Sequence, residues 1–139
     1  MRPVLDEGPF GFAEVNVEKQ RRDDGSLLNW MTGMIRLRKE CPEIGWGEWS
    51  LVKTAAPGVL GLRYQWKGNA LIVLHNFTPK PKEARFRLTE PEAHVLTNLR
   101  QNDESRADQD GRHRIALEAY GYRWYRVGAL DHLLHRHNA

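Results

Sequence analysis

The sequence lacks most features that set a chain apart from an ordinary folded domain. Its 139 residues include one cysteine, Cys41, so neither an intramolecular disulfide nor a cysteine-paired zinc site can form. No apolar run approaches the roughly 20 residues of a membrane-spanning helix, and the N-terminus meets acidic residues at once, unlike a secretory signal. We therefore expect a cytoplasmic chain with no membrane partner, no metal, no cofactor and a buried structural thiol at Cys41.

An excess of charge of one sign is also missing. The 21 basic and 18 acidic residues give a net charge of +3 and alternate along the chain. The densest basic run, residues 36–39, lies where a helix is expected to end, and cations there complement the helix dipole. A nucleic-acid partner is therefore not expected. A hydrophobic content of 40% with 28% charged residues is typical of a folded protein.

The clearest helical period covers residues 24–40. Asp23 is a suitable N-cap, Pro42 stops the helix, and Gly33 suggests close approach of another element. The apolar positions spread around more than half of the helix: Leu27, Leu28, Trp30, Met31, Met34, Ile35 and Leu37. This breadth predicts burial against two neighbours. The isolated chain should form a homodimer through helix 24–40, or pack Phe10 and Phe12 of its leader onto it.

From Gly45 onward the period changes to two, which is typical of strands. Seven short strands are expected, at residues 46–52, 59–66, 70–77, 83–88, 94–98, 114–117 and 120–127. Residues 100–111 are expected to form a polar loop, and residues 129–138 a last short helix. The sequence thus predicts a mainly β fold, an antiparallel β-sandwich of about seven strands, preceded by one α-helix and an irregular leader.

Tryptophans are the strongest candidates for ligand contact. Trp46, Trp49 and Trp66 lie on predicted strands, and exposed aromatic faces can stack on sugar rings. Trp46 and Trp49 are three residues apart, so on a regular strand they face opposite sides, and one of them should be in the core. Packing against a neighbouring domain is the favoured alternative. Trp30 and Trp124 are expected to be structural.

No catalytic residue is expected in this chain. Two adjacent acidic pairs, Asp23-Asp24 and Asp103-Glu104, lie in predicted polar loops, where a helix cap and solvated charges account for them. His132, His135 and His137 resemble a metal site only loosely, and adventitious binding or solvation is the favoured interpretation.

Several stretches resemble the end of trehalose synthases, α-amylase-like enzymes of glycoside hydrolase family thirteen. GPFGF at residues 8–12 and SLLNW at residues 26–30 resemble the end of the catalytic barrel. IRLRKECPE at residues 35–43 is similar to the final, Arg-rich barrel helix that ends in Pro. LIVLHNF at residues 71–77 and YGYRWYRV at residues 120–127 resemble strands of the C-terminal sandwich.

This resemblance, which covers residues 8–127, implies a parent enzyme that interconverts maltose and trehalose or hydrolyses α-glucans. The family's catalytic carboxylates lie in upstream barrel strands whose motifs are absent here, so this chain alone is not expected to be an enzyme. Residues 1–44 would be a leader and the final helix of a truncated (β/α)8 barrel, and residues 45–139 the C-terminal β-sandwich.

The implied role of the sandwich is to stabilise the catalytic barrel, its expected partner, without taking part in catalysis. The alternative is a free-standing carbohydrate-binding module of β-sandwich type, for which an α-glucan or a disaccharide would be the ligand.

Overall fold

The computed structural model describes residues 6–128, and the chain divides into two compact units between residues 40 and 41. The helix expected at residues 129–138 lies outside the described residues, as do His132, His135 and His137. Within the described part, no helix is long and apolar enough to cross a membrane. The units are taken one at a time below.

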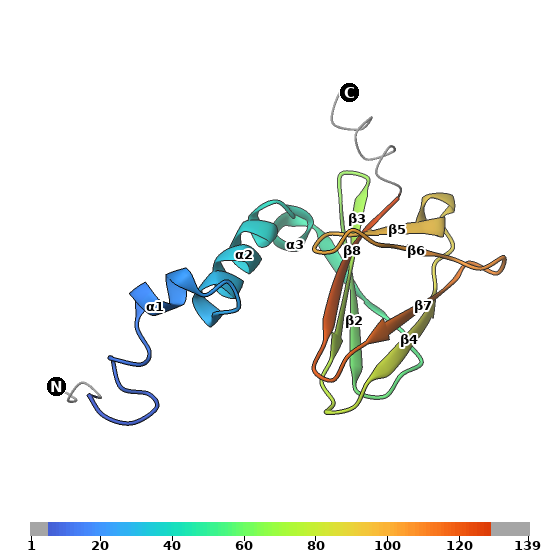
Figure 1. Cartoon of the computed structure of the whole chain (residues 1–139). Helices are drawn as coiled ribbons and strands as arrows, with labels where there is room; N and C mark the ends of the chain where they lie inside the picture. The colour runs from blue at the N-terminus through green and yellow to red at the C-terminus, as the bar shows by residue number, and fades with distance from the viewer. Residues whose placement is uncertain (1–5, 129–139) are drawn as a thin grey trace. The chain divides into compact units, whose positions relative to one another are not determined.

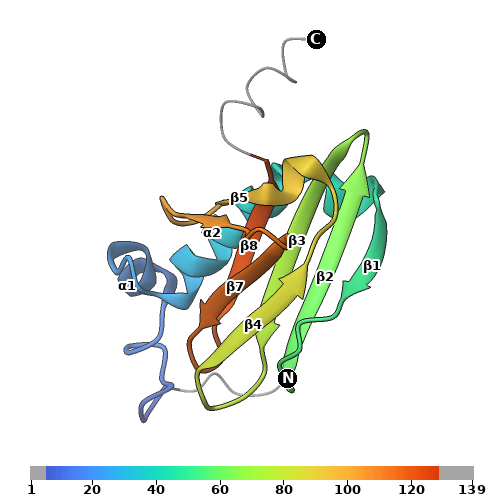
Figure 2. The ribbon, with the colours of Figure 1, turned by 90° about the vertical axis from the view of Figure 1, so that its right-hand side faces the viewer.

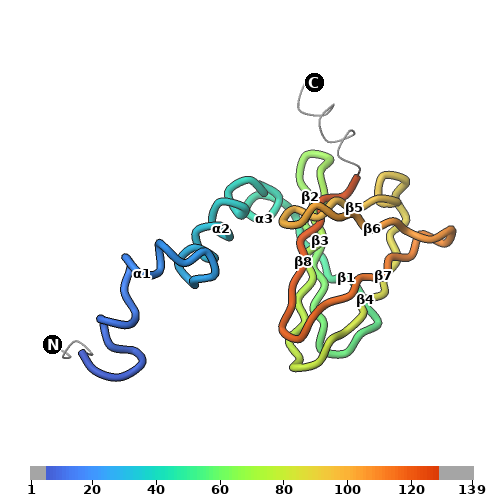
Figure 3. Tube along the Cα trace, in the orientation of Figure 1, coloured from blue at the N-terminus to red at the C-terminus, as the bar shows by residue number. Residues whose placement is uncertain are grey.

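The first unit contains two helices, α1 (Val17–Arg22) and α2 (Leu27–Lys39), visible in Figure 3. The expectation of an irregular leader is therefore wrong for the segment covered by α1. Its polar run becomes helical because the Asn16 side chain accepts a hydrogen bond from the Lys19 N–H at 2.8 Å. The leader also packs at the start of α2, where Gln20 Oε1 accepts from the Leu28 N–H at 2.9 Å.

The predicted N-cap of the long helix is three residues too early. Ser26 caps α2, its Oγ accepting from the Asn29 N–H at 3.2 Å, whereas Asp23 is the C-cap of α1. The Asp23 carboxylate instead accepts from the Gly25 N–H at 2.9 Å. Because α1 must end before the chain can turn, residues 23–26 form this turn and α2 begins at Leu27.

Neither α1 nor α2 contains a buried residue. The expectation that Phe10 and Phe12 pack onto the long helix is wrong, since their exposed fractions are 77% and 58%. Gly33 has no close neighbour either, because an added Cβ would meet no described atom within 4 Å.

The second unit is a β-sandwich preceded by a short helix, α3 (Glu43–Trp46). The strands are β1 (Glu48–Val52), β2 (Val59–Trp66), β3 (Asn69–Asn76), β4 (Lys82–Arg87), β5 (Val95–Asn98), β6 (Glu104–Arg106), β7 (Arg112–Leu117) and β8 (Tyr122–Val127), with a 3-10 turn η1 (Pro91–His94). One sheet has the order β1-β2-β3-β8-β5-β6, and β4 pairs with β7 in the other. Figures 1 and 2 show the two layers.

The predicted mainly β, antiparallel sandwich is confirmed, with eight strands instead of about seven. The additional strand is β6, which lies inside the stretch predicted as a polar loop. It forms because three residues pair with β5, from Thr97↔Glu104 to Val95↔Arg106, although the segment has no apolar alternation. Trp46 lies in α3 and not on the first strand, because Pro42 begins a helical turn there.

The core lies between the two sheets. It is formed by alternate residues of the facing strands together with η1: Ile72, Leu74, Ala84, Phe86, Leu88, Ala93, Leu96, Ile115, Leu117 and Tyr125. Trp124 was expected to be structural, but its neighbour Tyr125 is the residue on the core face, only 3% exposed. Successive strand residues face opposite sides, so Trp124 points to the other face of the sheet.

Candidate functional site

The face of the six-stranded sheet that points away from the core is also apolar. Cross-strand partners lie on the same face of a sheet, and the register forms two rows: Trp49–Tyr64–Leu71–Arg126 and Leu51–Leu62–Val73–Trp124. We call the apolar members the outer face: Trp49, Leu51, Leu62, Tyr64, Leu71, Val73 and Trp124. Its middle is covered and its β1 edge is not, since Leu71 is 0% exposed whereas Trp49 and Leu51 are 65% and 67% exposed.

A third row continues this face with aromatic rings. The His75 ring stacks between Phe77, at a centroid distance of 5.9 Å, and Tyr122, at 6.0 Å. Arg100 Nη1 donates to Tyr122 Oη at 2.6 Å and its guanidinium lies over the Tyr122 ring. Burial lowers the pKa of His75, so this ring is neutral at neutral pH. The row is therefore suited to contact with another apolar surface.

A buried ion pair fastens α3 to this sheet. The Arg126 guanidinium lies 3.4 Å from Glu43 Oε1, and the Glu43 side chain is only 2% exposed. Arg126 Nη2 also lies 3.7 Å from the Sγ of Cys41, which is buried as expected. Gly47 permits the close approach, because an added Cβ would lie 2.6 Å from the Gln65 carbonyl oxygen. The segment entering β1 is thus held on the sheet.

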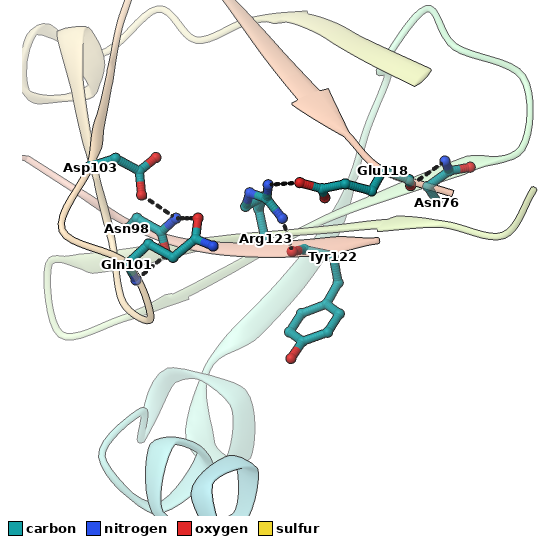
Figure 4. A network of polar contacts seen from close by, with 7 residues as sticks. All are labelled: Asn76, Asn98, Gln101, Asp103, Glu118, Tyr122 and Arg123. Atoms are coloured by element: carbon teal, nitrogen blue, oxygen red, sulfur yellow. Dashed lines mark hydrogen bonds and ion pairs between the residues drawn. The ribbon is translucent and has the colours of Figure 1, made fainter. Parts of the chain in front are cut away.

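A polar network lies at the start of β8, and Figure 4 shows the Tyr122 side chain pointing away from it. Arg123 donates to Glu118 Oε1 at 2.7 Å, while Asn98 Nδ2 donates to Asp103 Oδ1 at 2.7 Å. Burial, with the nearby Asp103 carboxylate, raises the pKa of Tyr125 to about 12. The first bond ties β8 to the segment after β7, and the second closes the loop after β5. Asn98, Glu118 and Arg123 are among the residues that line a cavity of about 350 Å³.

Asn76 holds the adjacent turns and is 2% exposed. Its amide donates to the carbonyl oxygens of Lys80 and Glu118, each at 2.8 Å, and its Oδ1 accepts from the Thr78 N–H and hydroxyl. All four hydrogen-bonding positions of the side chain are used. This accounts physically for an Asn at the end of the LIVLHNF strand.

The carboxyl groups with shifted pKa values remain ionised. The Arg112 backbone N–H lowers the pKa of Asp108, and the Arg123 guanidinium lowers that of Glu118. Partial burial raises the pKa of Glu90, but backbone N–H groups and Arg63 outweigh it and lower the pKa overall. A glycosidase general acid needs a raised pKa instead. No group of three or more possible metal ligands occurs among residues 6–128.

The structure places the three candidate tryptophans on neighbouring elements. Trp49 pairs with Tyr64, and Trp66 lies two residues after Tyr64 on β2, so both tryptophans lie on the outer side of the sheet. Trp46 lies on α3. The expectation that either Trp46 or Trp49 is in the core is wrong, because they are 78% and 65% exposed. The period of two does not run through α3. Trp66 is half-buried, with Lys67 Nζ 4.5 Å from its ring centroid.

Comparison with known proteins shows which domains the sandwich is similar to. Residues 68–126 match the family of sucrose hydrolase-like C-terminal domains. The fold is similar to an α-amylase structure from Geobacillus thermoleovorans, with a TM-score of 0.68 and 19% identity over 88% of this chain and 26% of that one. An identity of 19% to the α-amylase structure shows a shared fold and nothing more.

Two of the relatives that the chain matches are trehalose synthases. The chain is 24% identical to trehalose synthase of Pimelobacter sp. (strain R48) over 90% of its own length, and 25% identical to that of Thermus thermophilus over 96%. It spans only 22% and 14% of these two proteins. The resemblance to the C-terminal region of a trehalose synthase-like enzyme of the α-amylase family is thereby confirmed.

Proposed function

We propose that this chain is the non-catalytic C-terminal domain of a trehalose synthase-like enzyme, and that its outer face packs on the catalytic barrel and stabilises it. The parent would act on α-glucosidic bonds, interconverting maltose and trehalose or hydrolysing α-glucans. The observation that carries the proposal is an apolar face on the side of the sheet opposite the core. A reducing, cytoplasmic location fits the single buried thiol of Cys41.

The cost of leaving the outer face in water supports a partner. Trp49 and Leu51, both at the β1 edge, are 65% and 67% exposed, and Phe77 at the end of β3 is 66% exposed. Burying a large apolar side chain contributes about 1.5–3 kcal/mol, and contiguous exposed apolar patches mark interaction surfaces. A barrel that covers this edge would gain stability from each of these side chains.

The carboxyl groups of the described sandwich residues also suit a non-catalytic role. A retaining glycosidase needs two carboxyl groups about 5 Å apart, one of them with a raised pKa. The carboxyl groups of Asp108 and Glu118 have lowered pKa values and lie on exposed turns. We therefore expect no turnover of maltose, trehalose or starch by the purified chain, and turnover that follows the protein peak would contradict the proposal.

The decisive experiment concerns the complete reading frame that contains this chain. Upstream barrel strands with catalytic carboxylates would support the proposal, and their absence would overturn it. In the complete enzyme, Trp49→Ser with Leu51→Ser should shorten the half-life of activity at elevated temperature. Tyr120→Ser removes an equally exposed aromatic from the turn before β8 and should leave the half-life unchanged.

A second function is favoured by the exposure of Trp46 and Trp49, because each of these two indole rings is available to stack on a sugar ring. This alternative is a free-standing carbohydrate-binding module. Titration with maltose, trehalose and maltodextrin, followed by tryptophan fluorescence, distinguishes the two functions. Saturation that Trp46→Ala abolishes would favour the module, whereas an unchanged emission favours the docking domain.

The exposed apolar residues of α2 lead to a further proposal about the isolated chain. Leu27, Met31 and Ile35 are 67%, 43% and 50% exposed. We propose that two copies pair through α2 when the barrel is absent, because pairing would remove these side chains from water. Sedimentation should show a dimer that Met31→Glu weakens, and a monomer at all concentrations would contradict the pairing.

A further inference from the structure

The exposed face of the two-stranded sheet carries four arginines in register. Arg85 pairs with Arg114 and Arg87 pairs with Arg112, so each arginine lies directly across from another. All four side chains are exposed, while the intervening residues Ala84, Phe86, His113 and Ile115 face the core. We call these four residues the arginine ladder. Figure 2 shows β4 and β7 in front of the larger sheet.

A fifth cation belongs to the same surface. Lys53 is exposed and follows β1, next to Thr54, whose carbonyl oxygen accepts a hydrogen bond from the Arg85 N–H at 2.7 Å. Lys53 and the arginine ladder line a cavity of about 390 Å³. The five cationic residues therefore line one concave surface of the sandwich.

Neighbouring carboxylates neutralise only part of this charge. Arg85 Nε lies 2.5 Å from Glu83 and Arg112 Nη1 lies 3.4 Å from Asp110. Within the described residues, Arg87, Arg114 and Lys53 form no ion pair within 4 Å. Arg114 and Arg112 also interact electrostatically with the Asp108 carboxylate, which lies near them. Like charges directly opposite one another destabilise a sheet. A bound anion would offset the repulsion between the two opposed arginine pairs and would explain why a sheet of only two strands contains them.

We propose that the arginine ladder and Lys53 bind a compact anion that carries phosphate groups. The planar guanidinium fork matches phosphate oxygens in a bidentate arrangement. All four arginines line the same cavity, so several forks are within reach of one ligand. This site lies on the opposite layer of the sandwich from the outer face, so it goes beyond the proposed docking role.

The acidic boundary of the site selects a small ligand. Glu83 lies on β4 beyond Arg85, while Asp108 and Asp110 lie in the turn that precedes Arg112. A long polyanion that followed the ribbon would meet carboxylates at both ends and be repelled. A pyrophosphate or a sugar phosphate fits between them.

Isothermal titration of the full chain tests the site with pyrophosphate and, separately, glucose 1-phosphate, against sodium sulfate at equal ionic strength. Saturable binding of either phosphate probe is expected, and the tighter of the two identifies the source. Arg87→Gln with Arg114→Gln removes one member of each opposed pair and should weaken binding at least about tenfold. Lys80→Gln with Arg106→Gln makes the same charge change at exposed positions outside the cavity and should change affinity less than about twofold.

A second readout follows from the repulsion within the ladder. Without ligand at low salt, the Arg87→Gln/Arg114→Gln variant should melt at the same temperature as the unsubstituted chain or above it. Pyrophosphate should then raise the melting temperature of the unsubstituted chain but not that of the variant. No saturation by either phosphate probe, equal affinity for sulfate, or equal affinity in the variant would overturn the proposal. Tighter binding of a short DNA duplex than of pyrophosphate would also overturn it.

Discussion

The two units of the chain hold their structure in different ways. The sandwich has a core between two sheets in which Ile72, Leu74 and Leu96 are completely buried. In the first unit, α1 and α2 bury no residue, and capping and side-chain hydrogen bonds hold the helices together. Two short helices without a buried face gain little from packing. The sandwich therefore has the basis of an independent domain, and the helical unit requires a partner surface.

The same contrast appears in the distribution of polar groups. In the sandwich, buried polar side chains such as Asn76, His113 and Glu43 have partners across elements distant in sequence. In the first unit, bonds such as those from Asn29 to Gln20 and from Leu28 to Gln20 span nine and eight residues. Local bonds can form in a fragment, whereas the distant ones specify the sandwich. Substitutions in the two units should therefore have very different costs.

The largest difference is expected for one substitution made in both units. Leu74→Ala, at a site that is 0% exposed, should lower the free energy of unfolding by about 2–5 kcal/mol. Leu27→Ala, at a site that is 67% exposed, should lower it by less than about 0.5 kcal/mol. Urea denaturation of both variants measures the comparison. Similar midpoints would show that α2 is as firmly packed as β3.

The second largest difference is expected in the stability lost when an ion pair of each unit is broken. Glu43→Gln removes one charge from the buried pair with the largely buried Arg126 guanidinium and should cost about 2–3 kcal/mol. Glu18→Gln removes the partner of Arg22 in an exposed pair on α1 and should change stability by less than about 0.5 kcal/mol. Chemical denaturation compares them, and an equal effect would mean that α3 is not anchored by its ion pair.

The pH dependence of the sandwich should come from His113, which is completely buried. Its Nε2 lies 2.7 Å from the Ala93 carbonyl oxygen and its Nδ1 lies 2.9 Å from Ser105 Oγ, so the neutral ring donates to the first and accepts from the second. Burial lowers the pKa of His113 below its ordinary value of 6.5. At lower pH the unfolded chain binds a proton that the folded chain excludes.

The stability that neutral His113 contributes is therefore complete above pH 6.5 and is lost as the pH falls through its folded pKa. Melting temperatures measured from pH 7.5 down to pH 5 should decline, and the decline should be shallower in His113→Gln. His94→Gln, at an exposed site, removes a charge that also lowers the pKa of His113, so it should make the decline shallower as well, but by less than His113→Gln. A slope unchanged by His113→Gln would assign the dependence to another group, such as His75.

The sequence could predict those parts of the molecule that depend on local periodicity. Alternation identified seven of the eight strands and Pro42 identified the end of the long helix. It could not find β6, which forms only because β5 offers it hydrogen bonds. A strand period of two places Trp46 and Trp49 on opposite faces. This prediction is wrong because the period does not extend through α3, the helical turn between Pro42 and Gly47.

The arginine ladder shows the same limit for a candidate site. Arg85 and Arg87 alternate with apolar residues in the sequence, as do Arg112 and Arg114, so each strand alone has an ordinary solvated face. The two pairs are separated by 24 or more residues, and only the β4–β7 register places them opposite one another. Charge averaged along the chain therefore hides a basic surface that strand pairing creates.

The smallest effect is expected from removing the first unit altogether. A chain of residues 41–139 retains all eight strands, α3, and the Glu43–Arg126 ion pair. Because α1 and α2 bury none of their residues, their loss should change the melting temperature by less than about 2 °C, equivalent to less than about 0.5 kcal/mol. Differential scanning calorimetry measures this shift. Removal should also reduce self-association, since the exposed apolar residues of α2 are lost. A fall of ten degrees or more would instead mean that the helical unit supports the sandwich.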